Sequence, residues 1–137
     1  MTPEQQQPET QPPPEVAPRP LTPREEAVLV ALITRGAWAG DDDVTPGPDD
    51  RARWLAQVPS TRAGRRCTCG TCPSIELTDP AGWTPDVGDS RVVLQAGAQG
   101  ALVFLFIEED RLSYLELAPD AATSHDFPDP KGLDFLE

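Results

Sequence analysis

Three cysteines, the only ones in the chain, lie within one short segment as Cys67, Cys69 and Cys72. Thiolates bind Zn²⁺ at about 2.3 Å, and such short spacings allow several sulfurs to converge from a single turn. A structural zinc site needs a fourth ligand, and His125 is the only histidine. One hypothesis is therefore a structural Cys₃His zinc site formed by these four side chains.

Two other interpretations of the cysteines remain open. Cys69 and Cys72 form a Cys-x-x-Cys pair, which in redox proteins usually opens a helix, whereas residues 73–78 have the pattern of a strand. Cysteine is also among the most buried residue types, and the interpretation that the sequence favours is that all three thiols simply pack as small apolar side chains. The sequence thus predicts either no cofactor or one structural zinc.

The net charge is −12, from 23 acidic and 11 basic residues, with a pI near 4.3. Such a surface repels nucleic acid and anionic membrane and accelerates encounter with basic proteins. We expect a protein partner, basic in character, and neither a nucleic acid nor a membrane.

Two charged clusters are candidates for binding this partner. One is basic and the other acidic; they comprise Arg62, Arg65 and Arg66, and Glu108, Glu109 and Asp110. The alternative is that the arginines pair with nearby carboxylates and that the acidic residues form a solvated turn.

No residue pattern indicates catalysis. Ser124, His125 and Asp126 are the residue types of a hydrolytic triad, but neighbours on an extended segment point apart. The chain carries no phosphate-binding or dinucleotide-binding glycine motif. We expect a protein that is not an enzyme.

Composition divides the chain into a tail and one domain. Residues 1–21 are rich in Pro and Gln and are predicted to be disordered, whereas residues 22–137 are predicted to form a single domain. The sequence has neither a signal peptide nor an apolar run approaching the roughly 20 residues of a membrane span, which predicts a cytoplasmic protein.

The best local signal predicts a helix that begins at Pro23. Thr22 caps its first turn, Glu25 completes a capping box, and Gly36 follows the expected end at Thr34 or Arg35. A second helix is predicted over residues 50–58, capped by Asp49 or Asp50.

Strand patterns occupy the rest of the chain. Two arms flank the cysteines and three longer strands follow, over residues 66–69, 74–78, 91–96, 101–108 and 111–117. Residues 102–107 are apolar on both faces, so we expect a central strand covered on both sides. The predicted fold is α+β, with two N-terminal helices packed on an antiparallel meander sheet of four or five strands.

The motif Arg-Cys-x-Cys-Gly-x-Cys-Pro-Ser-Ile-Glu-Leu at residues 66–77 and the strand pair at 104–116 resemble small proteins of high-GC actinobacteria. The resemblance spans about residues 22–130 and implies a fold but no catalytic residues. In size and charge alone, the chain is also similar to small acidic immunity or antitoxin-type proteins. We therefore expect an acidic protein-interaction module; the alternative is a zinc-binding or thiol-reactive protein.

Native mass spectrometry of protein purified without chelator or added metal distinguishes the interpretations of the cysteines. One zinc per chain, lost on denaturation, is the result expected of a site at Cys67, Cys69, Cys72 and His125. A chain without metal that carries three reduced thiols is the result expected of packing residues.

Overall fold

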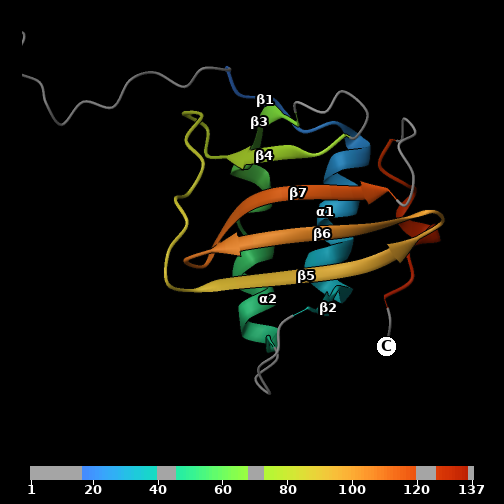
Figure 1. The fold of residues 1–137 in the computed structure, drawn as a ribbon. Coiled ribbons are helices and arrows are strands. Elements are labelled where there is room, and N and C mark those ends of the chain that lie inside the picture. The colour runs from blue at the N-terminus through green and yellow to red at the C-terminus, as the bar shows by residue number, and fades with distance from the viewer. Residues whose placement is uncertain (1–16, 40–45, 68–72, 120–125, 136–137) are drawn as a thin grey trace, which may run out of the picture.

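The computed structural model describes residues 17–39, 46–67, 73–119 and 126–135 (Figure 1). This part of the chain contains two α-helices and seven strands. In chain order the elements are β1 (Arg19–Pro20), α1 (Pro23–Arg35), β2 (Ala37–Trp38), α2 (Pro48–Leu55), β3 (Arg62–Arg66), β4 (Ile75–Thr78), β5 (Arg91–Ala98), β6 (Ala101–Glu108) and β7 (Arg111–Pro119), with short 3₁₀ turns at Val58–Ser60 and Pro130–Gly132.

All seven strands form one antiparallel sheet, in the order β1-β3-β4-β7-β6-β5-β2. The prediction of a meander of four or five strands was wrong. Only β5, β6 and β7 follow one another as a meander, because β4 pairs with β7 and the chain then crosses to β5 along one end of the sheet (Figure 1). The two additional strands are the outermost ones, β1 and β2, which have two residues each.

Strand β1 lies in the segment whose composition resembles a tail. Arg19 pairs with Ala63 and Pro20 with Arg62, so the sheet begins before the first helix. The remainder of the predicted disordered tail, residues 1–16, lies outside the described residues.

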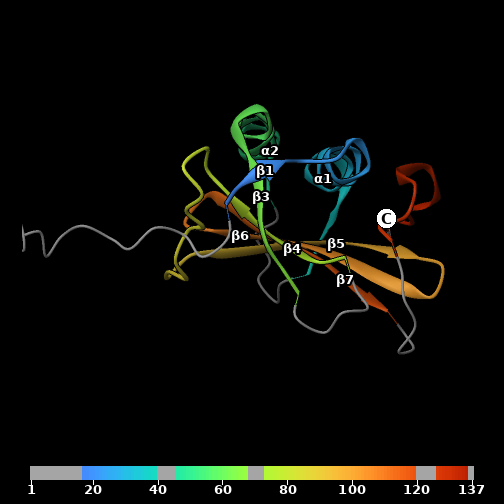
Figure 2. The same ribbon diagram turned by 90° about the horizontal axis from the view of Figure 1, so that it is seen from above.

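Both helices lie on the same side of the sheet (Figure 2). Helix α1 contacts β5, β6 and α2. The predicted packing of two helices on a meander of four or five strands was wrong, because the sheet beneath them has seven strands. The core fills the space between α1 and the sheet; its fully buried members include Val28, Leu29, Leu32, Ile33, Leu94, Leu105, Ile107 and Leu115.

Helix α1 begins and ends as its sequence predicts. The Glu25 N–H donates to Thr22 Oγ1 at 3.1 Å and the Thr22 N–H donates to Glu25 Oε1 at 2.8 Å, a complete capping box. Gly36 follows the helix with an extended backbone that any residue could adopt. Glycine is needed here because Leu32 and Leu94 lie too close to leave room for a side chain. A Cβ there would lie 2.5 Å from the Leu32 carbonyl oxygen and 3.0 Å from Leu94 Cβ.

Helix α2 differs from its predicted bounds at both ends. It begins at Pro48, after Gly47, and the Asp50 carboxylate accepts from the Gly47 N–H at 2.9 Å from within the first turn. Asp50 is therefore not the residue before the helix. The helix ends at Leu55, and the buried Val58 belongs to the 3₁₀ turn that follows.

The alternation along β6 defines two different faces of the sheet. Val103, Leu105 and Ile107 are fully buried under the helices, whereas Leu102 is 41% exposed and Phe104 and Phe106 are half-buried. The prediction that this strand is covered on both sides was wrong, because the side chains of the second face remain partly exposed. No described helix lies on that face (Figure 2). We call this second face the outer face.

Truncation of two leucines on β6 tests the assignment of the faces. Leu105→Ala removes a fully buried side chain and is expected to lower the free energy of unfolding by about 2–5 kcal/mol in urea titrations. Leu102→Ala, three residues earlier on the outer face, is the matched control and is expected to cost less than about 1 kcal/mol. Equal losses for the two variants would contradict the assignment.

Candidate functional site

The outer face combines aromatic rings with carboxylates. Strand register places Phe106 opposite Tyr114 and Phe104 opposite Glu116, and Glu76 pairs with Tyr114 from the other side. The Phe106 ring centroid lies 6.3 Å from that of Phe104 and 6.2 Å from that of Tyr114. The three rings thus form a continuous half-buried row across two central strands, with glutamates beside it.

A cavity of about 390 Å³ lies where this row meets the loop between β4 and β5. We call it the glutamate pocket. Its walls are formed by three carboxylates, one guanidinium, two aromatic rings, a serine of β7 and three loop residues: Glu76, Glu108, Glu116, Arg91, Phe106, Tyr114, Ser113, Thr84, Pro85 and Val87. Three acidic side chains against one basic give the pocket a formal charge of −2. Carboxylates and aromatic faces together favour a cationic ligand.

Glu108 is the most buried acidic residue of the pocket, with a residue exposure of 1%. Arg91 Nε donates to Glu108 Oε2 at 2.5 Å, and the Arg91 guanidinium carbon lies 5.5 Å from the Phe106 ring centroid. Among the described residues, the other oxygen, Glu108 Oε1, has no hydrogen-bond partner. A buried carboxylate oxygen without a donor is costly, and native structures contain few.

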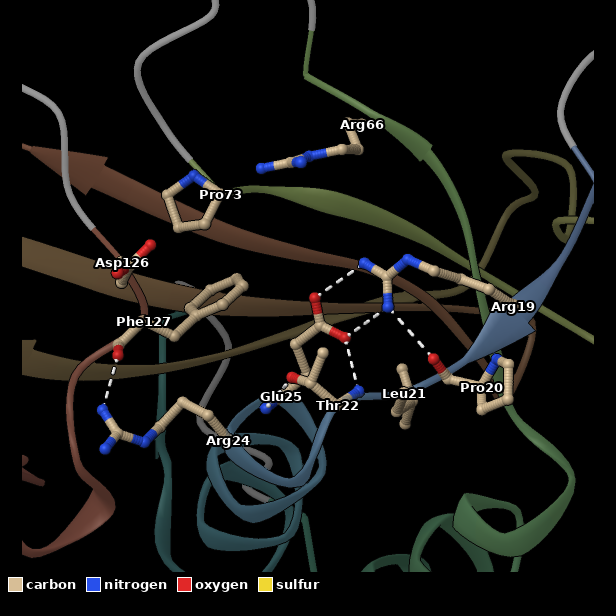
Figure 3. A pocket seen from close by; sticks show the side chains of 10 residues that line it. All are labelled: Arg19, Pro20, Leu21, Thr22, Arg24, Glu25, Arg66, Pro73, Asp126 and Phe127. Atoms are coloured by element: carbon tan, nitrogen blue, oxygen red, sulfur yellow. Dashed lines mark hydrogen bonds and ion pairs between the residues drawn. The ribbon is translucent and has the colours of Figure 1, made fainter.

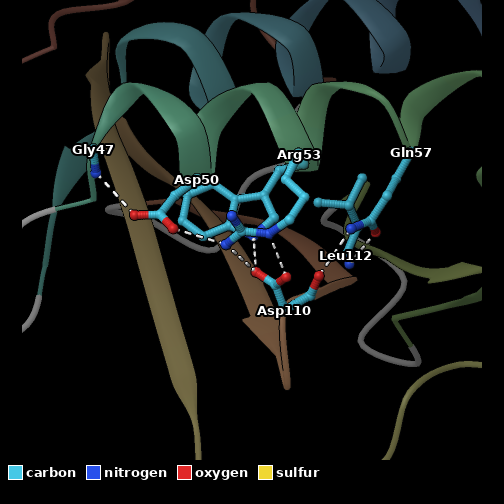
Figure 4. A network of polar contacts seen from close by, with 7 residues as sticks. Gly47, Asp50, Arg53, Gln57, Asp110 and Leu112 are labelled. Atoms are coloured by element: carbon cyan, nitrogen blue, oxygen red, sulfur yellow. Dashed lines mark hydrogen bonds and ion pairs between the residues drawn. The ribbon is translucent and has the colours of Figure 1, made fainter.

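Asp110 holds helix α2 against the β6–β7 turn (Figure 4). Its carboxylate accepts from Arg53 Nε at 2.6 Å, from Arg53 Nη2 at 2.9 Å and from Trp54 Nε1 at 2.7 Å. Gln57 Nε2 donates to the Asp110 carbonyl oxygen at 2.8 Å, while the Leu112 N–H donates to Gln57 Oε1 at 3.1 Å. The turn is thereby fixed to one side of the helix.

The pKa values of these carboxyl groups follow from the same contacts. Hydrogen bonds from Arg53 hold the pKa of Asp110 below its ordinary value, with a smaller contribution from Trp54. Arg53 likewise lowers the pKa of Asp50, to which it donates at 2.7 Å. Both groups are stabilised as carboxylates by one shared arginine.

The predicted acidic cluster is therefore divided among three structural roles. Glu108 is buried in the glutamate pocket, Asp110 holds α2, and Glu109 accepts from the Ser90 N–H at 3.2 Å. Glu109 and Asp110 adopt left-handed backbone conformations, with φ of 48° and 68°, which suit a two-residue hairpin turn. Of the three residues, only Glu108 lies in the glutamate pocket.

The predicted basic cluster lies at the other side of the sheet, near its β1 edge. Arg62 donates to the carbonyl oxygens of Pro59 and Thr61 at 3.2 and 3.1 Å, while Arg65 and Arg66 are exposed. Arg66 lies at the rim of a larger cavity of about 770 Å³ (Figure 3). Arg62 does not line this cavity, so the three arginines do not act as one patch there.

Two arginines that line this larger cavity make contacts within the fold. Arg19 donates to both Glu25 oxygens at 2.9 Å, and Arg24 donates to the Phe127 carbonyl oxygen at 2.9 Å (Figure 3). Burial raises the pKa of Glu25, but the hydrogen bonds from Arg19 and Thr22 outweigh burial and leave it below its ordinary value. These contacts join β1, α1 and the C-terminal segment and serve the fold.

The zinc hypothesis for Cys67, Cys69, Cys72 and His125 stays a prediction. Cys69, Cys72 and His125 lie outside the described residues, and the Cys67 N–H donates to the Ser74 carbonyl oxygen at 2.9 Å beside β4. Within the described residues, no group of three or more His, Cys, Asp and Glu side chains is arranged to hold a metal. In the same part of the chain, no helix has the length and apolar character needed to cross a membrane.

Comparisons of the chain with protein-family models, with curated proteins and with solved structures each returned no match. The geometry of the outer face is therefore the basis for assigning a function.

Four residues of the outer face were not identified from the sequence: Glu76, Phe106, Tyr114 and Glu116. Their signal was present as alternation, because Tyr114 and Glu116 occupy the positions opposite in phase to the buried Leu115 and Leu117. The alternation separates the two faces of a strand but does not show which face the helices cover.

The Asp110 network predicts a pH-dependent contribution to stability. Asn is tolerated at positive φ, so Asp110→Asn changes mainly the charge. We expect a loss of about 1 kcal/mol in the free energy of unfolding at pH 7, modest because the side chain is 46% exposed. The folded pKa is below the unfolded value of about 3.9, so the contribution is complete above that value and disappears as the pH falls through the folded pKa.

Urea titrations of both proteins between about pH 7 and pH 2 measure this difference. Asp86→Asn, which removes an exposed carboxylate from the loop before β5, is the control and should show no loss at any pH. A loss for Asp110→Asn that stays constant with pH would contradict the assigned role of the charge.

Proposed function

We propose that this protein is a non-enzymatic, acidic interaction module that binds a basic protein across its outer face. The observation that carries the proposal is the row of Phe104, Phe106 and Tyr114 beside the glutamate pocket, on a face without helix cover in the described part of the chain. Aromatic residues at the centre of an interface with charges around them are the usual anatomy of a protein-binding surface.

Charge supports a basic partner. The chain carries −12 overall and the glutamate pocket carries −2, so a partner rich in Lys or Arg is attracted both at a distance and on contact. The same charges repel a phosphate backbone, which argues against nucleic acid. We place this binding in the cytoplasm, where the three cysteines would stay reduced.

Selection of 12-residue peptides from a phage-displayed random library on the immobilised full chain tests the proposal. We expect the enriched peptides to combine basic and apolar residues, and their affinity to fall as NaCl rises from about 0.05 to 0.3 M. Enriched peptides without an excess of Lys and Arg would contradict a basic partner.

Two double variants with the same change in net charge locate the binding surface. Glu76→Gln with Glu116→Gln, on the outer face, is expected to weaken peptide binding about tenfold, equivalent to about 1.4 kcal/mol. Glu26→Gln with Asp49→Asn, on the exposed first turns of the helices, should weaken it less than about threefold, because those charges act only through the long-range field. Equal losses in the two double variants would show that binding follows net charge and would contradict a site on the outer face.

A further inference from the structure

Glu108 has an incomplete set of hydrogen bonds in the structure. The side chain is 2% exposed, Oε2 accepts from Arg91, and Oε1 has no donor among the described residues. An ionised carboxylate can accept from a guanidinium with both oxygens at once, and such bidentate pairs are the strong ones. The arrangement with Arg91 therefore leaves part of the binding capacity of this buried carboxylate unused.

Arg91 is constrained in a way that explains this shortfall. It lies on β5 directly opposite Glu108, and it reaches the carboxylate through Nε while its guanidinium lies over Phe106. Its side chain is 46% exposed, in contrast to that of Glu108. Arg91 can therefore turn towards solvent, whereas Glu108 stays buried and then needs another cation as its partner.

The rest of the glutamate pocket suits a planar cation. Phe106 and Tyr114 present aromatic rings, and Glu76 on β4 and Glu116 on β7 add carboxylates. Guanidinium groups stack on aromatic faces and match carboxylates with a planar fork of donors, whereas an ammonium group is a compact, strongly hydrated charge. Arginine fits this combination of groups better than lysine.

We propose that the glutamate pocket binds the guanidinium of an arginine side chain from the partner, which replaces Arg91 on Glu108 and pairs with both carboxylate oxygens. This inference rests on the proposed function and specifies its central contact. Arg91 is then an internal competitor that occupies the pocket until a better-placed guanidinium enters.

Amide NMR titration of the full chain with N-acetyl-L-arginine amide tests the proposal. We expect saturable shifts confined to the strands around Arg91, Phe106, Glu108 and Tyr114. N-acetyl-L-lysine amide should bind at least about fivefold more weakly, because its hydrated ammonium lacks the planar fork of two parallel donors. N-acetyl-L-citrulline amide keeps the shape and lacks the charge, and it should cause no saturable shift. Equal shifts with arginine and lysine, or shifts spread over the whole acidic surface, would overturn the proposal.

Two variants separate Glu108 from the general charge of the chain. Glu108→Gln should weaken binding of the arginine amide by about tenfold or more, whereas Glu26→Gln, an equal charge change on α1, should leave it unchanged. Arg91→Met should strengthen binding, because the competitor is removed while the apolar stem is kept. The Arg91 variant gives a readout even if Glu108→Gln does not fold. Weaker binding by Arg91→Met would overturn the role of Arg91 as a competitor.

The experiments distinguish failure of this inference from failure of the proposed function. If selected basic peptides bind the outer face but tolerate exchange of every Arg for Lys, and the arginine amide causes no local shifts, the arginine pocket is refuted and the proposed function stands. If the arginine amide binds at Glu108 while no basic peptide binds the outer face, the pocket is supported and the protein-binding function is refuted.

Discussion

In the described part of the chain both helices cover the same face of the sheet, whereas the inner strand β6 carries apolar side chains on both faces. Burial under α1 and its neighbours covers Val103, Leu105 and Ile107, which accounts for the apolar side chains of one face only. On the other face, Phe104 and Phe106 shield part of their surface against each other and against neighbouring side chains. A remaining contiguous apolar surface is unfavourable in water and usually marks a binding surface. Because both described helices lie on one face, the apolar side chains of the outer face stay partly exposed and available to a partner.

The edge strands of the sheet are poorly suited to binding, which favours the outer face as the binding surface. Both outermost strands have only two residues, and β1 includes Pro20, which lacks an N–H to donate. The strand inside the β2 edge is also closed at its far end, where Asp134 and Gly97 exchange backbone hydrogen bonds at 2.6 and 2.8 Å. Short edges of this kind offer little backbone for an added strand, so side chains of the outer face are the available surface.

Features of the fold and of the site that depend on residues close together in sequence were predictable, whereas those that depend on distant residues were not. The capping box at Thr22 and Glu25 and the bounds of β6 are local features, and the sequence predicts them well. Strands of two residues such as β2 have no periodicity, and the pairing of β4 with β7 depends on contacts between distant residues. The acidic turn shows the same limit, because its composition indicates exposure while its left-handed backbone carries Asp110 to Arg53, 57 residues away in sequence.

Net charge alone does not determine which acidic residues select a partner. Asp50, Asp110 and Glu25 are already paired with arginines of this chain, so an incoming cation would have to compete for them. In the described part of the chain, Glu76 and Glu116 have no such ion pair, and Glu108 shares one oxygen with Arg91. A partner must therefore offer more to Glu108 than Arg91 does, which disfavours weakly matched cations. An internal competitor of this kind converts general attraction to an acidic surface into a preference for one side-chain geometry.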